Sequence, residues 1–483
     1  MILANLSACL VGPDFKSPMP PKIRHYTERP WTYKTASVSG KAGVSQRFIK
    51  AENISPQWWR SFHSRKLNKL VCRGLVNSPN LSAAKAVLRE AQENLNASVG
   101  NLFPAFTAQL SAQRGSGAGF FNSNASNSTV TGSNVPTGSV FTLLNAAVNV
   151  AYALDLFGGV RRGIEALQSQ VDYQYFEWRA AYLSLTGNIV TTSIAMASLQ
   201  TQIRVTKQLI CEQEDQLRII KQQFKLGGAS GADVLAQETQ VAQTKATLPP
   251  LEKSRDQTRH ALAILVGSFP SASCLPTLYL SELTLPTRLP LCIPSSLVRH
   301  RPDVRAAEAL WKAANAQVGV ATANLYPQFT ITGTYGKSDS IGNKLIGSQQ
   351  SNLWSIGGTL LQPLFKGGML IAQRRAAIAA YDQAAAQYQQ VVLQAFQNVA
   401  DTLRALEADA RELRAQKKAE LAAHAALKLT RQQFYLGGVS YLTLLDAQRQ
   451  YQQTRISLIR AQASRYTDTA ALYQALGGGW WNC

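Results

Sequence analysis

Acidic side chains are scarce in this sequence. It has 28 Asp and Glu against 49 Lys and Arg in 483 residues, which gives a net charge of +21. Such a balance is compatible with nucleic-acid binding or with contact to an anionic membrane surface. The basic residues form no run with interleaved aromatics, however, and they are spread over segments with a helical pattern. We therefore expect a dispersed basic surface and no nucleic-acid partner.

Residues suited to catalysis or metal binding are also sparse. The 6 cysteines include no CxxC pair, and none lies with a histidine at metal-ligand spacing. The 5 histidines are scattered, and none is placed near a candidate nucleophile. The glycine pairs at 158–159 and 367–368 are not followed by the Lys-Ser/Thr of a phosphate-binding loop. We expect no enzyme activity, no catalytic residue, no metal and no cofactor.

Long hydrophobic runs are missing as well. No stretch approaches the roughly 18 consecutive apolar residues of a membrane-spanning helix. The most apolar helical stretch, residues 180–199, is interrupted by Ser, Thr and Asn. If this chain crosses a membrane, it must therefore do so with strands.

Proline and glycine are absent from one long stretch, between Gly368 and Gly437. As a helix this stretch would reach about 100 Å at 1.5 Å per residue, and residues 160–225 form its counterpart. Each predicted helix ends at a Leu-Gly-Gly sequence, a helix stop, and a returning helix follows it. The returning helices are predicted over about residues 232–265, which Pro249-Pro250 interrupts, and 440–476.

The sequence contains an internal duplication. Asn101–Thr107 (NLFPAFT) recurs as Asn324–Thr330 (NLYPQFT), and Gln222–Gly228 (QQFKLGG) recurs as Gln432–Gly438 (QQFYLGG). The repeated unit is far longer than the 20–50 residues of solenoid repeats. We therefore predict one structural module made twice, with its elements in the same order.

Each half contains two segments that alternate between apolar and polar residues, the pattern of strands with two different faces. These segments are residues 106–113, 148–156, 329–335 and 354–361. A polar loop, at 115–139 in the first half and about 337–351 in the second, separates each pair, so each pair is predicted to form a hairpin. Strands of about ten residues suffice to cross a bilayer at a tilt. A soluble sandwich is the alternative, but it needs more strands.

A sheet of four strands cannot close on itself, and transmembrane barrels have at least about eight strands. Open sheet edges are not tolerated in hydrocarbon, because unpaired N–H and C=O groups find no water there. If the strands span a membrane, several chains must share one barrel, and a trimer would supply twelve strands.

The domain organisation follows from these segments. Residues 1–9 are predicted to be a truncated lipoprotein signal, and 10–57 an extended tether. Residues 58–267 form the first repeat, with a strand hairpin at about 104–157 and a helical hairpin at about 160–265. Residues 268–300 are predicted to be a linker, or equatorial segment. The second repeat follows at 301–477, with its strand hairpin at about 327–365 and its helical hairpin at about 369–476. Residues 478–483 are a C-terminal tail.

The signal is inferred from Leu6–Cys9, the pattern that lipoprotein signal peptidase reads. Too few residues precede Cys9 for a charged region and an apolar core. Cys9 is the predicted lipid anchor, and a chance match of four residues is the alternative.

Several motifs that are weak alone are specific in their common order and spacing. They are Cys9–Phe15, Trp58-Trp59, Arg301–Val304 followed by Ala307-Glu308, Ala321–Pro327, Leu442–Gln448 and Leu476–Trp480. With them the chain resembles the TolC-like outer membrane factors of tripartite efflux and secretion systems, in particular their lipoprotein (NodT-type) branch. The resemblance covers essentially the whole chain after the signal.

The resemblance implies an α+β membrane protein, in which a trimeric transmembrane β-barrel with four strands per chain is continued by a long α-helical barrel. It implies an outer membrane channel that passively conducts small molecules to the exterior. The expected partners are two further copies of the chain, a periplasmic adaptor, an inner-membrane pump and outer membrane lipid. The expected location is the outer membrane, with a lipid anchor and a helical part extending into the periplasm.

The same resemblance implies where the site lies, because in relatives such positions line the constricted periplasmic tip. The expected gate residues are Asp233, Leu442 and Asp446, and the expected partner-docking turns contain Gly227, Gly228, Gly437 and Gly438. Helix capping is the alternative for both aspartates, since carboxylates are stabilised at helix N-termini. A core position is the alternative for the leucine.

Two other functions stay open from the sequence. A soluble coiled-coil scaffold would have no membrane strands, and a basic nucleic-acid-binding protein would have a steeply salt-dependent affinity.

Overall fold

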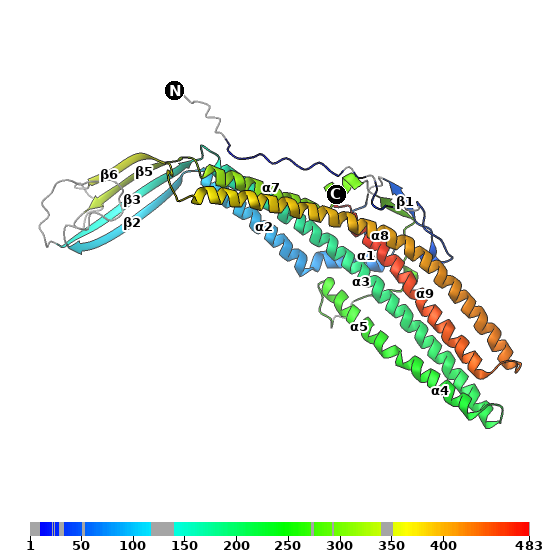
Figure 1. Ribbon diagram of the computed structural model, residues 1–483. Helices are drawn as coiled ribbons and strands as arrows, with labels where there is room; N and C mark the ends of the chain where they lie inside the picture. Colours follow the sequence, from blue (N-terminus) through cyan, green and yellow to red (C-terminus); the bar gives the residue numbers. More distant parts are fainter. Residues whose placement is uncertain are drawn as a thin grey trace. The chain divides into compact units, whose positions relative to one another are not determined.

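The computed structural model describes residues 10–21, 23, 25–28, 33–50, 54–116, 140–271, 275–291, 294–339 and 351–482. The chain forms two compact units, each assembled from segments that are distant in sequence (Figure 1). Unit 1 contains Met1–Lys16, Arg89–Asp172 and Ala309–Ala386, and unit 2 contains Ser17–Leu88, Tyr173–Glu308 and Gln387–Cys483. The predicted boundaries of the two successive repeats stay a prediction.

Unit 1 contains an antiparallel sheet of four strands in the order β2-β3-β5-β6. The strands are β2 (Ala105–Ser116), β3 (Val140–Leu154), β5 (Gln328–Asp339) and β6 (Ser351–Leu361). Three of them cover the segments that alternate in sequence, and β3 covers its segment up to Leu154 and starts eight residues before it, so the prediction of these strands is confirmed. The two predicted polar loops lie mostly outside the described residues, and β5 continues to Asp339, past the expected start of its loop.

The strand register aligns the apolar faces of the two hairpins. Phe106 pairs with Val150, Val150 with Gly333, and Gly333 with Ile356, so these residues form one row across the sheet. On this face Phe106 is 70% exposed and Ile356 77% exposed within the single chain. Successive residues of a strand point to opposite faces. The polar residues that alternate with this row therefore form the other face of the sheet. There Thr334 Oγ1 donates to Asn149 Oδ1 at 2.9 Å.

Four helices contribute to both units: α2 (Pro79–Val99), α3 (Gly159–Lys225), α7 (Pro302–Ala323) and α8 (Met369–Tyr435). The helices α3 and α8 have 67 residues each, as the absence of helix breakers predicts. Among the described residues, no helix combines the length and apolarity needed to span a bilayer.

The returning helices lie in unit 2 and differ in continuity. The first is split into α4 (Gly231–Ala246) and α5 (Leu248–Leu265), with proline at the start of α5, where no intrahelical N–H bond is lost. The second, α9 (Tyr441–Ala475), is unbroken. The predicted interruption at Pro249-Pro250 is therefore confirmed.

The tryptophan pair belongs to the buried core of unit 2. Trp58 and Trp59 lie in the 3-10 helix η2 (Trp58–Phe62) and are each 2% exposed. The Trp58 ring stacks on Tyr473 with centroids 5.3 Å apart. The helices α1 (Arg65–Asn77) and α6 (Pro294–His300) complete this unit, together with short 3-10 helices at Lys41–Gly43, Leu280–Glu282 and Trp480–Asn482.

Part of the expected tether is not a simple extended segment. The strand β1 (Arg47–Lys50) pairs in parallel with β4 (Arg288–Leu291), which comes from the expected linker at 268–300. Phe48 is 7% exposed, and its strand partner Leu289 is fully buried. The prediction of an extended tether did not include this pairing, because four residues are too few for a visible periodicity and their partner is remote in sequence.

Candidate functional site

The two Leu-Gly-Gly turns have nearly the same backbone. Gly227 and Gly437 adopt φ angles of 71° and 74°, a left-handed conformation that glycine adopts without steric cost. The amide of Gly228 donates to Gln223 O at 2.8 Å, and the amide of Gly438 donates to Gln433 O at 2.8 Å. These bonds satisfy carbonyls at the ends of α3 and α8. The repeated QQF–LGG sequence thus produces the same turn twice.

A serine caps the helix that follows each turn, but the caps differ. The Ser230 side chain accepts from Asp233 N at 3.1 Å, and the Asp233 carboxylate accepts from Ser230 N at 3.0 Å, which completes a capping box. The Ser440 side chain accepts from Thr443 N at 3.3 Å, and threonine has no carboxylate to return a bond to the cap amide. The capping interpretation of Asp233 is therefore confirmed.

The capping interpretation of Asp446 was wrong. Asp446 lies in the second turn of α9, beyond the N–H groups that need a cap, and Ser440 already occupies the capping position. Its carboxylate pairs instead with Arg449 Nη1 at 3.3 Å, and both side chains are at least half exposed. An exposed pair of this kind contributes little to stability, so the charge of Asp446 is available to other groups.

The interpretation of Leu442 as a core residue was also wrong within this chain, since its side chain is 59% exposed. The neighbouring residues on α9 point inward: Leu444 and Leu445 are buried in a cluster with Ile220 of α3 and Leu427 of α8. This cluster joins the ends of the two helical hairpins inside unit 2. Leu442 lies in the first turn of α9 outside this cluster and presents an apolar side chain outward.

Tyr441 is a residue of this site that the sequence did not single out. It is 4% exposed, and its hydroxyl donates to Gln237 Oε1 at 2.6 Å. Gln237 in turn donates through Nε2 to Gln213 O at 2.8 Å, so α9, α4 and α3 are joined by buried polar groups. Burial, and then the charge of Asp233, raise the pKa of the Tyr441 hydroxyl above its ordinary value. The feature of the sequence that could have identified this residue is its position directly after the capping Ser440.

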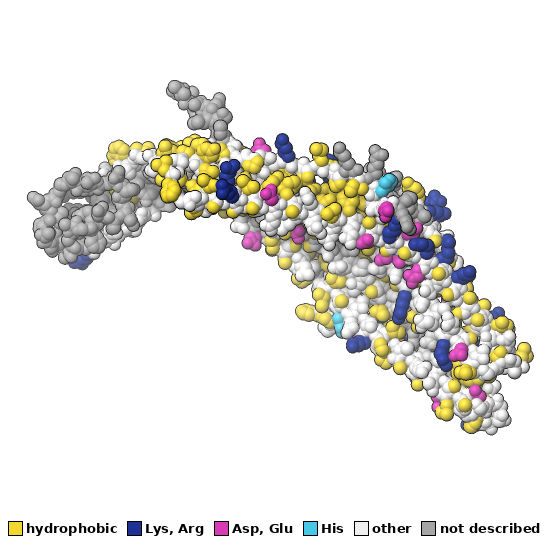
Figure 2. All heavy atoms as spheres, viewed as in Figure 1, with side chains coloured by type: hydrophobic (Ala, Val, Ile, Leu, Met, Phe, Trp, Pro, Cys, Tyr) yellow, Lys and Arg dark blue, Asp and Glu magenta, His cyan; other side chains and the backbone are white. Residues whose placement is uncertain are grey.

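Apolar side chains are exposed at the end of the helices (Figure 2, lower right). Leu226 is 87% exposed and Leu436 is 86% exposed, each directly before its glycine pair. Large apolar side chains on an exposed turn are typical of surfaces that contact another protein. The four turn glycines therefore lie between exposed leucines and capped helix starts.

The charges elsewhere do not gather into one patch. On the face drawn in Figure 2, Lys and Arg side chains are scattered and are interspersed with acidic ones. Among the residues that the structure describes, no group of three or more His, Cys, Asp or Glu could hold a metal ion. Cys9 lies outside the described residues.

Comparison with known proteins gives consistent matches along the chain. A family model for the outer membrane efflux protein matches residues 70–268 and 293–478. The chain is similar to the pyoverdine export outer membrane protein OpmQ of Pseudomonas aeruginosa, with 26% identity over 479 residues, 99% of this chain and 97% of the relative. It is 29% identical to nodulation protein T of Rhizobium leguminosarum bv. viciae, covering 98% of this chain and 91% of the relative.

A solved structure shares the fold. The outer-membrane channel OprN matches with a TM-score of 0.84 and 27% identity, covering 98% of this chain and 100% of that one.

Proposed function

This chain belongs to the outer membrane efflux protein family, and from this premise we propose that it acts as a homotrimer whose subunits together enclose one passive exit duct. The family match over both halves of the chain is the observation that carries the proposal. The cargo would enter from a periplasmic adaptor and an inner-membrane pump and leave to the exterior. The proposal includes no catalytic activity. Membership of a family of channels, which are not enzymes, supports this part of the proposal.

The sheet supports a wall shared between chains. Within one chain β2 and β6 are the outer strands, and each has a described partner on one side alone. In a bilayer these edges need partners, because hydrocarbon offers no hydrogen bonds to open strands. Three copies of the four-stranded sheet, joined β6 to β2, would close a barrel of twelve strands. The exposed row from Phe106 to Ile356 would then face lipid, and the polar row with Asn149 and Thr334 would face the lumen.

Native mass spectrometry in detergent, or cross-linking before solubilisation, tests the shared wall. We expect three chains per particle. A stable and fully folded monomer would exclude both the trimer and the barrel.

The lipid anchor is a second part of the proposal. The sequence Leu6–Cys9 matches the lipobox pattern, so Cys9 is proposed to carry the lipid once a full signal sequence is supplied. A single acylation site binds a membrane marginally, and the barrel would remain the main anchor. Mass spectrometry of the mature N-terminus provides the test, and an unmodified Cys9 in the membrane fraction would exclude acylation.

The turns at Gly227-Gly228 and Gly437-Gly438 are proposed to dock the adaptor or the pump. The exposed Leu226 and Leu436 support this, since three copies would present six leucines at one end of the duct. Leu226→Ser with Leu436→Ser should weaken cross-linking to the adaptor without lowering the trimer content. Unchanged adaptor cross-linking would exclude these turns as the docking surface.

The gate is proposed at the same end. Three outward-pointing copies of Leu442 near one axis could close a dry constriction, and three copies of Asp446 would repel one another or bind passing cations. Asp233 is the weakest of the three gate candidates, because its carboxylate already accepts two hydrogen bonds from Ser230.

Single-channel conductance in planar bilayers tests the gate. We expect Leu442→Ala to raise the conductance of intact trimers, and Asp446→Ala with Asp233→Ala to raise it as well. Leu436→Ala is the matched control, since it removes a leucine that is even more exposed than Leu442 and lies on the turn itself. Unchanged conductance in every variant would remove the gate assignment and leave the duct in place, whereas a wild-type trimer without conductance would contradict the duct.

A further inference from the structure

An open cavity of about 620 Å³ lies in unit 2, between α3, α5 and the segment that follows α5. Its volume falls in the range of pockets that hold a small organic ligand. Of its described lining side chains, four are basic and one is acidic: Arg204 and Lys207 on α3, and Arg255, Arg259 and Asp256 on α5. The cavity therefore has an excess of positive charge.

Two of the four basic side chains already have carboxylate partners. Arg255 Nε donates to Asp256 Oδ1 at 2.9 Å, and its Nη2 donates to Asp256 Oδ2 at 3.2 Å. These bonds from Arg255 lower the pKa of Asp256, so the carboxyl group is ionised at neutral pH. Lys207 Nζ pairs with Glu252 Oε1 at 3.0 Å. In both pairs the positive charge is balanced by a negative one.

The charges of Arg204 and Arg259 are not balanced in this way. In the described part of the chain, no carboxylate lies within ion-pair distance of either guanidinium, and neither donates a hydrogen bond to the protein. The Arg204 guanidinium lies over the Tyr279 ring, 5.1 Å from its centroid. A ring face supplies no lone pair, so the N–H donors of Arg204 still need acceptors. Two guanidinium groups on different helices thus face one cavity without a counter-ion.

The aromatic wall of the cavity is held in place by the surrounding backbone. Lys66 Nζ donates to Thr277 O at 2.8 Å and pairs with Glu282 Oε1 at 2.8 Å. The amide of Tyr279 donates to the other oxygen of the same carboxylate, Glu282 Oε2, at 3.4 Å. The ring that contacts Arg204 is therefore positioned before any ligand binds, which reduces the entropic cost of binding.

The remaining walls of the cavity include apolar side chains. Met196 and Ile203 of α3 are 2% and 6% exposed, and Leu275 and Pro276 line the side that the segment after α5 forms. Apolar walls keep the local dielectric constant below that of water, so a guanidinium attracts an anion more strongly there. They also offer contacts to carbon atoms, which favours an organic anion over a bare ion.

We propose that this cavity binds a small organic anion that carries two negative charges on phosphate or carboxylate groups, held by Arg204 of α3 and Arg259 of α5. Guanidinium groups bind both classes of oxyanion through paired N–H donors. The two unbalanced positive charges match two negative ones, and Tyr279 with the apolar walls contacts the carbon part of the ligand. This site goes beyond the proposed duct, because it lies within one chain and needs no conduction.

Isothermal titration calorimetry on the purified full-length protein in detergent tests the site. Phenyl phosphate and phthalate are the two ligands, at a pH where both carry two charges, and benzoate, with one carboxylate on the same ring, is the control ligand. We expect at least one of the two dianions to bind at one site per chain, about tenfold or more tightly than benzoate. The dianion that binds more tightly distinguishes a phosphate from a carboxylate ligand.

Variants of the cavity locate the binding. Arg204→Gln and Arg259→Gln should each weaken binding of the dianion about tenfold, because each removes a charge-assisted contact. Arg218→Gln is the matched control, since it removes the same charge from an exposed arginine of α3 that lies outside the cavity and pairs with Asp215. We expect it to leave the affinity unchanged. Asp256→Asn should strengthen binding, because it removes the negative charge that lines the cavity.

Absence of binding of both dianions to the unsubstituted protein would overturn the proposal, and so would an equal affinity for benzoate. Equal weakening in Arg204→Gln and Arg218→Gln would assign the binding to the basic surface as a whole and overturn the site as well. Circular dichroism establishes that each variant is folded, and if one arginine variant is not, the other and Asp256→Asn still decide. The titration measures no current, so its failure leaves the duct in place.

Discussion

The first helical turn, residues 226–230, and the second, residues 436–440, lead into different side chains from nearly the same backbone. After the first turn come Gly231 and Ala232, and stability at this end comes from the capping box of Ser230 and Asp233. After the second come the buried Tyr441 and the exposed Leu442, and no carboxylate returns a bond to Ser440. Glycine and serine therefore determine the turn, while the next two residues determine what that end of the chain offers to its neighbours.

The two helical hairpins differ in what they can contribute to the proposed duct. Duplication gave both hairpins the same turn, so both can reach the same end of the molecule. The second hairpin alone carries an aromatic side chain fixed to the first hairpin and a leucine directed outward. For the proposed gate, this asymmetry favours a structural role for the first turn and the gating role for the second.

Replacing Tyr441 should have the largest effect on this asymmetry. Tyr441→Ala removes a buried ring and leaves Gln237 without its donor, so we expect a loss of about 3–5 kcal/mol in the free energy of unfolding. Tyr441→Phe removes the hydroxyl alone and should cost about 1 kcal/mol. Thermal unfolding of the detergent trimer by circular dichroism measures both. Equal losses would mean that the hydrogen bond, and not the ring, holds the hairpins together.

Alanine in place of the left-handed glycines should affect both turns alike. Gly227→Ala and Gly437→Ala each force a Cβ into positive φ, at a cost of about 1–2 kcal/mol. Nothing lies within 4 Å of a Cβ at either position, so the cost is one of backbone strain alone. Gly438→Ala is the control, because its φ is not positive. A clear difference between the two left-handed positions in the same melts would contradict the equivalence of the turns.

Removing the helix caps should affect the stability of the two turns differently. Ser230→Ala and Ser440→Ala should each cost about 1 kcal/mol. Asp233→Ala should cost a similar amount, because it breaks the reciprocal bond to the Ser230 amide, whereas Thr443→Ala should cost less. The unfolding midpoints of the four variants give the comparison. If Thr443→Ala cost as much as Asp233→Ala, the capping box would not distinguish the turns.

The stability of the protein should depend on pH through a carboxyl group of the second helical hairpin. Burial, and then the neighbouring Asp468, raise the pKa of Asp409 on α8 to about 7, while Arg465 opposes the rise. A carboxyl whose pKa is raised by folding binds its proton more tightly in the folded state. Stability is then fully present at low pH and falls as pH rises from about 4, the unfolded value, to about 7.

We expect the unfolding temperature to decline slightly over this range and the decline to be smaller in Asp409→Asn. The effect should be the smallest of the four, because Asp409 is only partly buried and solvent screens its interactions. Parallel pH profiles in the two proteins would assign the dependence to other groups.

The sequence by itself determined the elements that depend on local patterns. The lack of proline and glycine between Gly368 and Gly437 fixed the extent of α8, because nothing inside that stretch disfavours the helix. Period-two alternation located all four strands of the sheet, since one face of each strand is apolar. The repeated Leu-Gly-Gly sequence located both turns, because a left-handed residue is needed where a helix stops.

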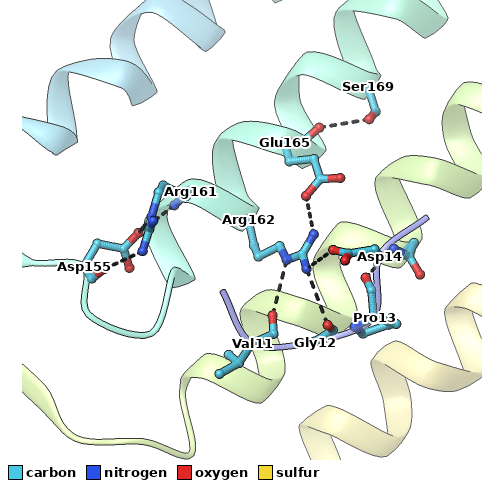
Figure 3. Close-up of polar contacts among 10 residues, drawn as sticks. Val11, Gly12, Pro13, Asp14, Asp155, Arg161, Arg162, Glu165 and Ser169 are labelled. Carbon is cyan, nitrogen blue, oxygen red and sulfur yellow. Dashed lines mark hydrogen bonds and ion pairs between the residues drawn. The ribbon is translucent and has the colours of Figure 1, made fainter. Parts of the chain in front are cut away.

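Only the tertiary structure decided which groups meet. Three sets of contacts join residues far apart in the chain: β1 with β4, Tyr441 with Gln237, and Arg162 with Val11, Gly12 and Asp14. No local period in the sequence predicts such contacts. The same holds for Leu442 and Asp446: their place in the sequence put them near the turn, but the packing of Leu444 and Leu445 decided that Leu442 faces outward. Arg161 and Arg162 are identical neighbours in the sequence, but the rotation of the helix between them directs Arg161 to Asp155 and Arg162 to Asp14 (Figure 3).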